Sequence, residues 1–242
     1  MLPWTMRVEQ LNEGMWAMTW LLVDEEGSNA VLIDPVWDEI SSYISVLEEQ
    51  NLTLTHCIAT HTHADHITGC FSLREITGCE YVMWSGTPSL GCTILVDEES
   101  QIEVGDLQIN FHHAPGHTAD SMVIECGDLI FTGDFLFTGS GGVGRDDLPS
   151  GRTHIHWQAL DVLERFDGEV MVCTGHDPPG TEMQTLAWNR ENNPVLAFST
   201  FEEYADWQQD TSSGLGSVSK IKVALPANIF AEIPDKVPWL DN

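Results

Sequence analysis

The chain has 242 residues, a length that fits one large domain or two small ones. It carries 38 acidic residues against 9 lysines and arginines, which gives a formal net charge of −29. A surface this negative repels phosphate backbones and anionic lipid headgroups, so we expect neither nucleic acid nor a membrane as a partner. Hydrophobic residues make up 42% of the chain, and this share argues against disorder.

The expected compartment is the cytoplasm. No apolar run approaches the roughly 18–20 residues that would span a bilayer. The first ten residues lack the basic and then apolar segments of a secretory signal. The six cysteines form no CxxC pair, so we expect reduced thiols in the core. The acidity is typical of a surface tuned for solubility, for example in a salty cytoplasm. The sequence does not specify the oligomeric state, and a homodimer is one state that it allows.

In the first third of the chain, strands are expected to alternate with helices. Apolar runs that end at turns predict strands over 15–23, 30–33 and 56–59. Asp38 is expected to cap a helix that presents Ile40, Ile44 and Leu47 on one face. A second helix is expected over 67–76, ending at Gly78. This order of elements argues for α/β layers.

The remainder of the chain is expected to repeat this organisation. Strands are predicted over 93–96, 102–104, 107–112, 122–125, 129–132 and 169–174, helices over 157–166, 181–192 and 201–209, and a glycine-rich loop over 138–153. There is no internal repeat by residue identity and no linker rich enough to divide the chain. We therefore predict an α/β protein with two similar halves in a single domain.

The strongest signal for chemistry is the segment THTHADH, which places His61, His63, Asp65 and His66 within six residues. Such crowding is unfavourable unless something positive lies between these side chains. Imidazole nitrogen and carboxylate oxygen are ligand types for zinc, iron and manganese. At the end of a strand, His61 and His63 can point to one side while Asp65 and His66 reach a second position nearby. The segment therefore predicts a metal site.

Three later segments supply further ligand types, each directly after a predicted strand. They are His117 in PGHTADS, Asp134 in FTGD and His176 in TGHD. Side chains at strand ends of an α/β structure lie where sites usually form. Together with the THTHADH segment, they predict a metal centre with two positions.

These four motifs, in this order, resemble the metallo-β-lactamase superfamily. The resemblance implies an αββα sandwich over residues 1–242, with a C-terminal extension from about residue 195 to 242 packed on it. It assigns one metal position to His61, His63 and His117 and the other to Asp65, His66 and His176, with Asp134 between them. Asp34, at the end of VLID, would support the ligands without being one.

Further segments resemble the persulfide dioxygenase branch of this superfamily. They are GVGRDD at 142–147, the helix that carries Glu191, Asn193 and Pro194 after TGHD, and LPAN at 225–228. The branch implies oxidation by O₂ of glutathione persulfide, or of a related low-molecular-weight persulfide, to sulfite and the thiol. It also implies a single Fe(II) held by His61, His117 and Asp134, which leaves three open positions on the metal. His63, Asp65, His66 and His176 would then form an unused second position or orient the ligands.

Two arginines are expected to bind the anionic substrate. Arg145 and Arg152 lie within eight positions of one another, shortly after Asp134, in a chain with few other cations. The sequence also departs from the branch nearby, with Val143 where many members have Cys, Asp146 where they have Thr, and Pro178 where they have Tyr. The change to Asp146 places a negative charge beside Arg145. In the alternative interpretation, both arginines pair with Asp146 and Asp147 and do not bind the substrate.

An alternative is a glyoxalase II-like hydroxyacylglutathione hydrolase. Such an enzyme would use all seven metal-type residues to hold two zinc ions, or a mixed zinc and iron pair, and to activate a bridging water. Every ligand type of the second position is present, so the alternative stays open. A nuclease is disfavoured by the charge, and a non-catalytic scaffold by the intact set of ligands.

Overall fold

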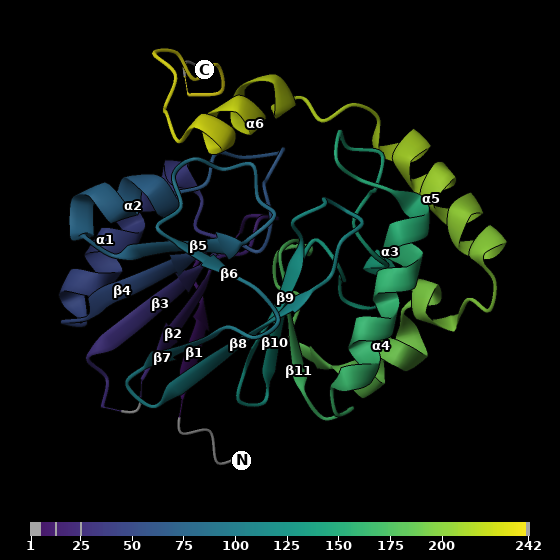
Figure 1. Cartoon of the computed structure of the whole chain (residues 1–242), viewed down its shortest axis with the longest axis horizontal. Helices are drawn as coiled ribbons and strands as arrows, with labels where there is room; N and C mark the ends of the chain where they lie inside the picture. The colour runs from purple at the N-terminus through teal and green to yellow at the C-terminus, as the bar shows by residue number, and fades with distance from the viewer. Residues whose placement is uncertain (1–5, 13, 25, 241–242) are drawn as a thin grey trace.

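The computed structural model describes residues 6–12, 14–24 and 26–240. Two six-stranded sheets face each other, and helices cover the outer face of each (Figure 1). The layers therefore follow the order helix, sheet, sheet, helix within one α/β domain. The αββα sandwich expected from the sequence is confirmed.

The first sheet has the strand order β1-β2-β3-β4-β5-β6. Its strands are β1 (Arg7–Gln10), β2 (Trp20–Val23), β3 (Asn29–Ile33), β4 (Thr53–Ile58), β5 (Glu80–Trp84) and β6 (Ile94–Val96). The pairs from β1 to β3 are antiparallel and the pairs from β3 to β6 are parallel. Parallel neighbours need a crossover, which α1 (Ile40–Glu49) supplies between β3 and β4 and α2 (Cys70–Thr77) between β4 and β5.

The second sheet has the order β12-β11-β10-β9-β8-β7, and only β10 and β11 are parallel among its described pairs. Its strands are β7 (Gln101–Val104), β8 (Leu107–His113), β9 (Met122–Cys126), β10 (Leu129–Gly133), β11 (Met171–Thr174) and β12 (Gln184–Thr185). The helices α3 (Thr153–Ala159), α4 (Leu186–Asn192) and α5 (Phe201–Leu215) lie on its outer side, whereas α6 (Ile221–Phe230) returns to the side of α2 (Figure 1).

Alternation along the strands builds three apolar clusters. Leu22 points between the sheets, where it packs in one cluster with Phe111 and Phe131. Its neighbour Leu21 points outward, into the cluster that includes Tyr43 of α1. A third cluster lies between the second sheet and its helices. Because successive side chains point to opposite faces and both faces are buried, the strands read as continuous apolar runs.

Several predicted boundaries differ from the structure. The strand expected over 15–23 is regular only from Trp20, because residues before it turn to meet the second sheet, where Met18 N donates to Gly175 O. Asp38 does not cap α1: it lies in the 3₁₀ turn Trp37–Glu39 that precedes the helix. The helix expected over 67–76 spans Cys70–Thr77, and Gly78 follows it with a left-handed backbone that ends the helix, at the residue expected.

The helical part of the second half is also redistributed. The helix expected over 157–166 is α3 followed by the 3₁₀ segment Leu160–Arg165. The one expected over 181–192 is the short strand β12 followed by α4. The helix expected over 201–209 continues to Leu215, and α6 was not predicted. No helix within the described part of the chain is long and apolar enough to cross a membrane.

Candidate metal centre

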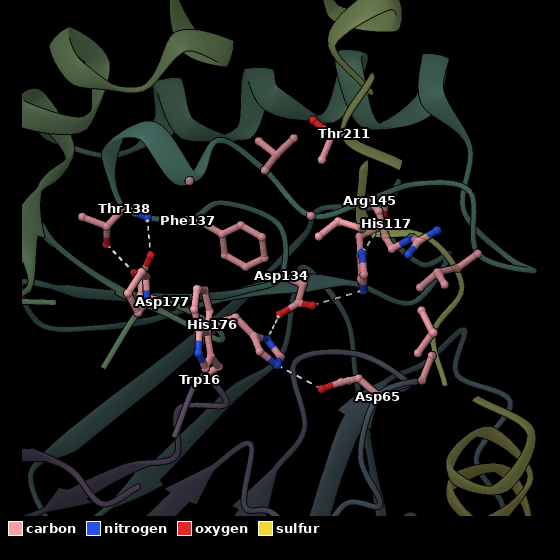
Figure 2. Close-up of a pocket in the computed structure, with 18 of the residues that line it drawn as sticks. Trp16, Asp65, His117, Asp134, Phe137, Thr138, Arg145, His176, Asp177 and Thr211 are labelled. Atoms are coloured by element: carbon pink, nitrogen blue, oxygen red, sulfur yellow. Dashed lines mark hydrogen bonds and ion pairs between the residues drawn. The ribbon is translucent and has the colours of Figure 1, made fainter. Parts of the chain in front are cut away.

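The metal-type side chains come together from four segments, each of which follows a strand. His61, His63, Asp65 and His66 lie in the loop between β4 and α2, which we call the metal loop and define as residues 59–69. His117 follows β8, Asp134 follows β10 and His176 follows β11. Figure 2 shows Asp134 between His117 and His176, with Asp65 on the far side of His176. The convergence predicted from the four motifs is present.

Two groups of side chains could each hold a cation. Ligand atoms of His61, His117 and Asp134 all lie within 4.8 Å of one another, as do those of His63, Asp65 and His66. The first group is the two-histidine, one-carboxylate set that the resemblance to persulfide dioxygenases implied for iron. The two-metal assignment differs from these groups, because His63 lies in the second group and His176 in neither.

Asp34 fixes which nitrogen of two histidines is free. Its Oδ2 accepts a hydrogen bond from Thr60 Oγ1 (2.7 Å), and its Oδ1 lies 3.1 Å from His63 Nε2. A carboxylate can only accept, so His63 carries its proton on Nε2. The Thr60 hydroxyl donates its single hydrogen to Asp34, so in its 3.0 Å contact with His61 Nδ1 the hydroxyl oxygen must accept and His61 Nδ1 must donate. The lone pairs left on His61 Nε2 and His63 Nδ1 face the centre of the cluster.

His117 is set in the same way by a backbone carbonyl. Its Nδ1 lies 2.6 Å from the carbonyl oxygen of Arg145, which can only accept, and its Nε2 lies 3.5 Å from Asp134 Oδ2. Burial lowers the pKa of His61 well below its ordinary value, and the His63 and His117 rings lower it further. Neutral imidazoles with free nitrogens are the form that binds metals.

Unpartnered buried nitrogens test whether the residues fit a metal. His61 Nε2, His63 Nδ1 and His66 Nε2 are buried and have no hydrogen-bond partner among the described residues. A buried polar atom without a partner costs free energy. Three such nitrogens in one cluster therefore indicate a site for a metal ion, which accepts their lone pairs. Nitrogen and carboxylate oxygen ligands suit zinc, iron or manganese. The site therefore fits a metal.

His176 has both ring nitrogens on carboxylates. Its Nδ1 lies 2.7 Å from Asp134 Oδ1 and its Nε2 lies 3.0 Å from Asp65 Oδ2 (Figure 2). Burial alone would lower the pKa of His176, but the charges of Asp134 and Asp65 outweigh burial and raise it well above its ordinary value. In this arrangement His176 orients the two aspartates and offers no free lone pair.

Two glycines allow the chain to close around Asp134. Gly144 N donates to Asp134 O (2.9 Å), and a β-carbon at Gly144 would lie 2.2 Å from that oxygen and 2.9 Å from His117 Nδ1. A β-carbon at Gly175 would lie 2.8 Å from Asp134 Oδ1. The second glycine of GVGRDD is thus required by close approach to two candidate ligands.

A cavity of about 870 Å³ opens onto the centre. His117, Asp134, Asp65 and His176 lie in its wall. The rest of the lining is largely apolar and includes Trp16, Phe137, Val143, Leu148, Trp188 and Leu215. Figure 2 shows Phe137 and Trp16 beside Asp134 and His176. The volume suits a small-molecule substrate.

The two arginines expected to bind the substrate are placed differently. Arg145 lines the cavity, but its guanidinium donates to both oxygens of Asp147 (2.6 and 2.7 Å) and to Gly216 O (2.7 Å). Arg152 is not among the described residues of the cavity wall, and it donates to the carbonyls of Pro149 and Gly151. Asp146 turns inward and contacts Thr153. The contact of either arginine with a substrate stays a prediction.

Two residues that support the metal loop were not predicted from the sequence. Asp120 accepts from Thr62 N (3.3 Å) and from Thr62 Oγ1 (2.5 Å), which ties the metal loop to the segment after His117. Asn228 contacts the same loop from α6. Both belong to motifs noted in the sequence, PGHTADS and LPAN, and those motifs were the available signal.

Comparison with known proteins agrees with this geometry. The family model described as the metallo-beta-lactamase superfamily matches residues 17–85 and 81–176. The chain belongs to this superfamily.

Within the superfamily, the chain falls in the persulfide dioxygenase branch. It is 31% identical over 215 residues to "Persulfide dioxygenase ETHE1, mitochondrial" of Mus musculus, covering 87% of this chain and 82% of the mouse protein. The crystal structure of ETHE1 from Myxococcus xanthus superposes with a TM-score of 0.85 at 33% identity, covering 93% of this chain and 98% of that one. A hydroxyacylglutathione hydrolase of Cereibacter sphaeroides is 30% identical over 178 residues, covering 71% of this chain and 66% of the hydrolase.

Proposed function

We propose that this protein is an Fe(II)-dependent persulfide dioxygenase that oxidises glutathione persulfide, or a related low-molecular-weight persulfide, with O₂. One persulfide, one O₂ and one water give the thiol, sulfite and two protons. The sulfane sulfur loses four electrons and O₂ gains them. The observation that carries the proposal is the set of His61, His117 and Asp134 beside a cavity of substrate size.

The chain's own residues would prepare this reaction in three ways. His61, His117 and Asp134 would hold one Fe(II), with the free nitrogens of both rings directed inward by Thr60 and by Arg145 O. Bound there, the iron would supply the electronic coupling between spin-paired sulfur and O₂ that the two lack on their own. His176 holds Asp134 Oδ1, so the carboxylate is oriented toward its other neighbours.

The apolar wall contributes to the proposed reaction by limiting water around the reacting sulfur. Trp16, Phe137 and Leu148 line the cavity together with His117 and Asp134. A persulfide sulfur is poorly hydrated, so an apolar wall suits it. Arg145 is the cavity-lining arginine that could meet a carboxylate of the carrier thiol, although Asp147 shares its charge.

A glyoxalase II-like hydrolase remains a second candidate because of one observation. The group His63, Asp65 and His66 could hold a second metal, and two metals could activate a water for attack on a thioester carbonyl. The match to a hydroxyacylglutathione hydrolase also supports this candidate, but it covers less of the chain than the match to the mouse dioxygenase.

Paired assays on one iron-loaded preparation distinguish the two. For the dioxygenase we expect O₂ consumption and sulfite formation with glutathione persulfide, and no cleavage of S-lactoylglutathione. Thioester cleavage without O₂ consumption would support the hydrolase instead. We expect activity in the cytoplasmic fraction of the host.

A further inference from the structure

The metal loop must be held by partners outside itself. Residues 59–69 between β4 and α2 form no helix or strand, yet they carry four of the seven metal-type side chains. Backbone N–H and C=O groups in a buried irregular segment need hydrogen bonds from elsewhere. The positions of the ligands therefore depend on the residues that supply those bonds.

The first part of the loop is anchored by two aspartates. Asp34, at the end of β3, accepts from Thr60 N and from Thr60 Oγ1, both at 2.7 Å. Asp120 accepts from Thr62 N and Thr62 Oγ1. Both aspartates lie within the segment matched by the superfamily model, which ends at residue 176.

The second part of the loop is held by backbone bonds, in which Trp37 N donates to Ile67 O and Gly69 N donates to Pro35 O, and by a side chain from the far end of the chain. Asn228 Nδ2 donates to His63 O and to His66 O, both at 2.9 Å, and Asn228 Oδ1 accepts from Thr68 N at 2.9 Å. The amide group thus uses both of its donors and its acceptor. These three contacts enclose the stretch that contains Asp65 and His66. Asn228 is only 2% exposed, so water does not replace these bonds.

The helix that carries Asn228 is itself held firmly. Ala224 and Ala227 of α6 pack into the same cluster as Phe71 of α2. Ser89 Oγ donates to Asn228 O (2.9 Å), and Leu90 N donates to Ile229 O (2.8 Å). The amide is therefore presented by a fixed backbone, because α6 is bound through both its side chains and its C-terminal carbonyls.

We propose that Asn228 is a positioning residue for the metal centre: it makes the geometry of His63, Asp65 and His66 depend on the C-terminal helix α6. Asp65 in turn contacts His176, which holds the proposed ligand Asp134, so the effect extends to the metal position itself. Without its amide, two buried carbonyls and one buried N–H of the metal loop lose their partners, so the loop relaxes toward other donors. Partners that orient metal ligands typically contribute about ten- to hundredfold in metal affinity. This role concerns metal binding and is independent of the proposed reaction.

Metal affinity and a metal spectrum test this role without any substrate. The variants are Asn228→Ala and Asn228→Asp, and the matched control is Val223→Ala, which removes packing from the same helix but none of the hydrogen bonds to the metal loop. Affinity for Co(II) is measured by chelator competition, ligand geometry by the Co(II) absorption spectrum, and stability by thermal unfolding.

Both Asn228 variants should weaken Co(II) binding by about tenfold or more and alter the Co(II) spectrum. Asn228→Asp keeps the side-chain size and the acceptor for Thr68 N, but it turns a carboxylate oxygen toward two carbonyl oxygens. Val223→Ala should lower Tm and leave the affinity and the spectrum as in the unchanged protein. If Asn228→Ala does not fold, the Co(II) affinity and spectrum of Asn228→Asp test the proposal.

Two results would overturn the proposal. One is unchanged Co(II) affinity and spectrum in a folded Asn228 variant. The other is a loss of affinity in Val223→Ala as large as that in the Asn228 variants at similar Tm, because Asn228 would then act only through the stability of α6.

Discussion

His176 Nδ1 lies 2.7 Å from Asp134 Oδ1, and the other nitrogen of the same ring lies 3.0 Å from Asp65 Oδ2. A histidine held between two carboxylates orients them and has no lone pair for a cation. The superfamily's two-metal assignment uses this residue as a ligand, whereas a single iron at His61, His117 and Asp134 needs it only to position Asp134. The contacts of His176 with Asp134 and Asp65 therefore favour the single-metal arrangement over the two-metal one.

Replacement of His176 by alanine should leave metal content near one ion per chain. Activity should fall by about ten- to hundredfold, because Asp134 loses the group that orients it. His61→Ala is the matched control and should lose the metal. Metal content is measured by elemental analysis after iron loading and desalting. A fall from two ions to one in His176→Ala would show that His176 is a ligand of a second metal.

A β-carbon at position 144 should disrupt the centre directly. Gly144→Ala brings that carbon to 2.2 Å from Asp134 O and 2.9 Å from His117 Nδ1, so both candidate ligands must move. We expect at least a tenfold loss of metal affinity, on the order seen when ligand orientation is lost. Gly214→Ala serves as the control, because nothing lies within 4 Å of its β-carbon, and it should bind metal normally. Normal binding by Gly144→Ala would contradict the close approach of this glycine to Asp134 and His117.

Adjacent aspartates should have opposite effects on stability. Burial, with a smaller contribution from the Asp147 carboxylate, raises the pKa of Asp146 to about 6, although the hydrogen bond from Thr153 acts in the opposite direction. The folded protein therefore binds more protons than the unfolded chain between pH 3.8 and about 6, so stability falls as pH rises through that window. Asp146→Asn removes this cost, and its Tm should exceed that of the unchanged protein at pH 7 but not at pH 4.

Asp147 provides the comparison. Hydrogen bonds from Arg145 hold the pKa of Asp147 below its usual range, so the ionised form is favoured in the folded state. Asp147→Asn should lower Tm at pH 7, because the folded state favours the ionised carboxylate that this variant removes. Thermal unfolding from pH 4 to pH 8 checks both variants, and a lower Tm for Asp146→Asn at pH 7 would refute the assignment.

Arg145 should affect substrate binding more than metal binding. Arg145 lines the cavity, and loss of a charged hydrogen bond to substrate would raise KM by about tenfold. Arg145→Ala should keep its iron. Arg152→Ala should leave KM within about twofold, since a surface charge away from the cavity contributes little. Steady-state O₂ uptake with glutathione persulfide measures KM, and an unchanged KM in Arg145→Ala would exclude a role in binding.

The sequence pattern was sufficient to predict α/β layers and the candidate ligands for a physical reason, whereas the αββα order of the layers came from the resemblance to the superfamily. Four of the seven metal-type residues are consecutive or nearly so in THTHADH, and the other three each follow an apolar strand. In an α/β structure the ends of strands carry side chains to a common edge, so the positions of these residues after strands were enough to predict that they meet. The predicted strand over 15–23 was too long at its start, because the apolar residues begin before the chain enters β2 at Trp20.

The supporting residues could not be predicted in the same way. Asn228 acts on residues 160 to 165 positions away, and no local pattern reports such a distance. Its helix α6 was missed because Pro226 lies inside it, and proline normally ends a helix. The pairing of Arg145 with Asp147 was one of the two alternatives that the sequence left open, and the structure shows it.

Iron content measured together with O₂ consumption on one preparation tests the central claim most directly. We predict one Fe(II) per chain and one O₂ consumed for each persulfide converted to sulfite and thiol, with both lost in His61→Ala. Two metals per chain, with thioester cleavage and no O₂ consumption, would contradict this prediction.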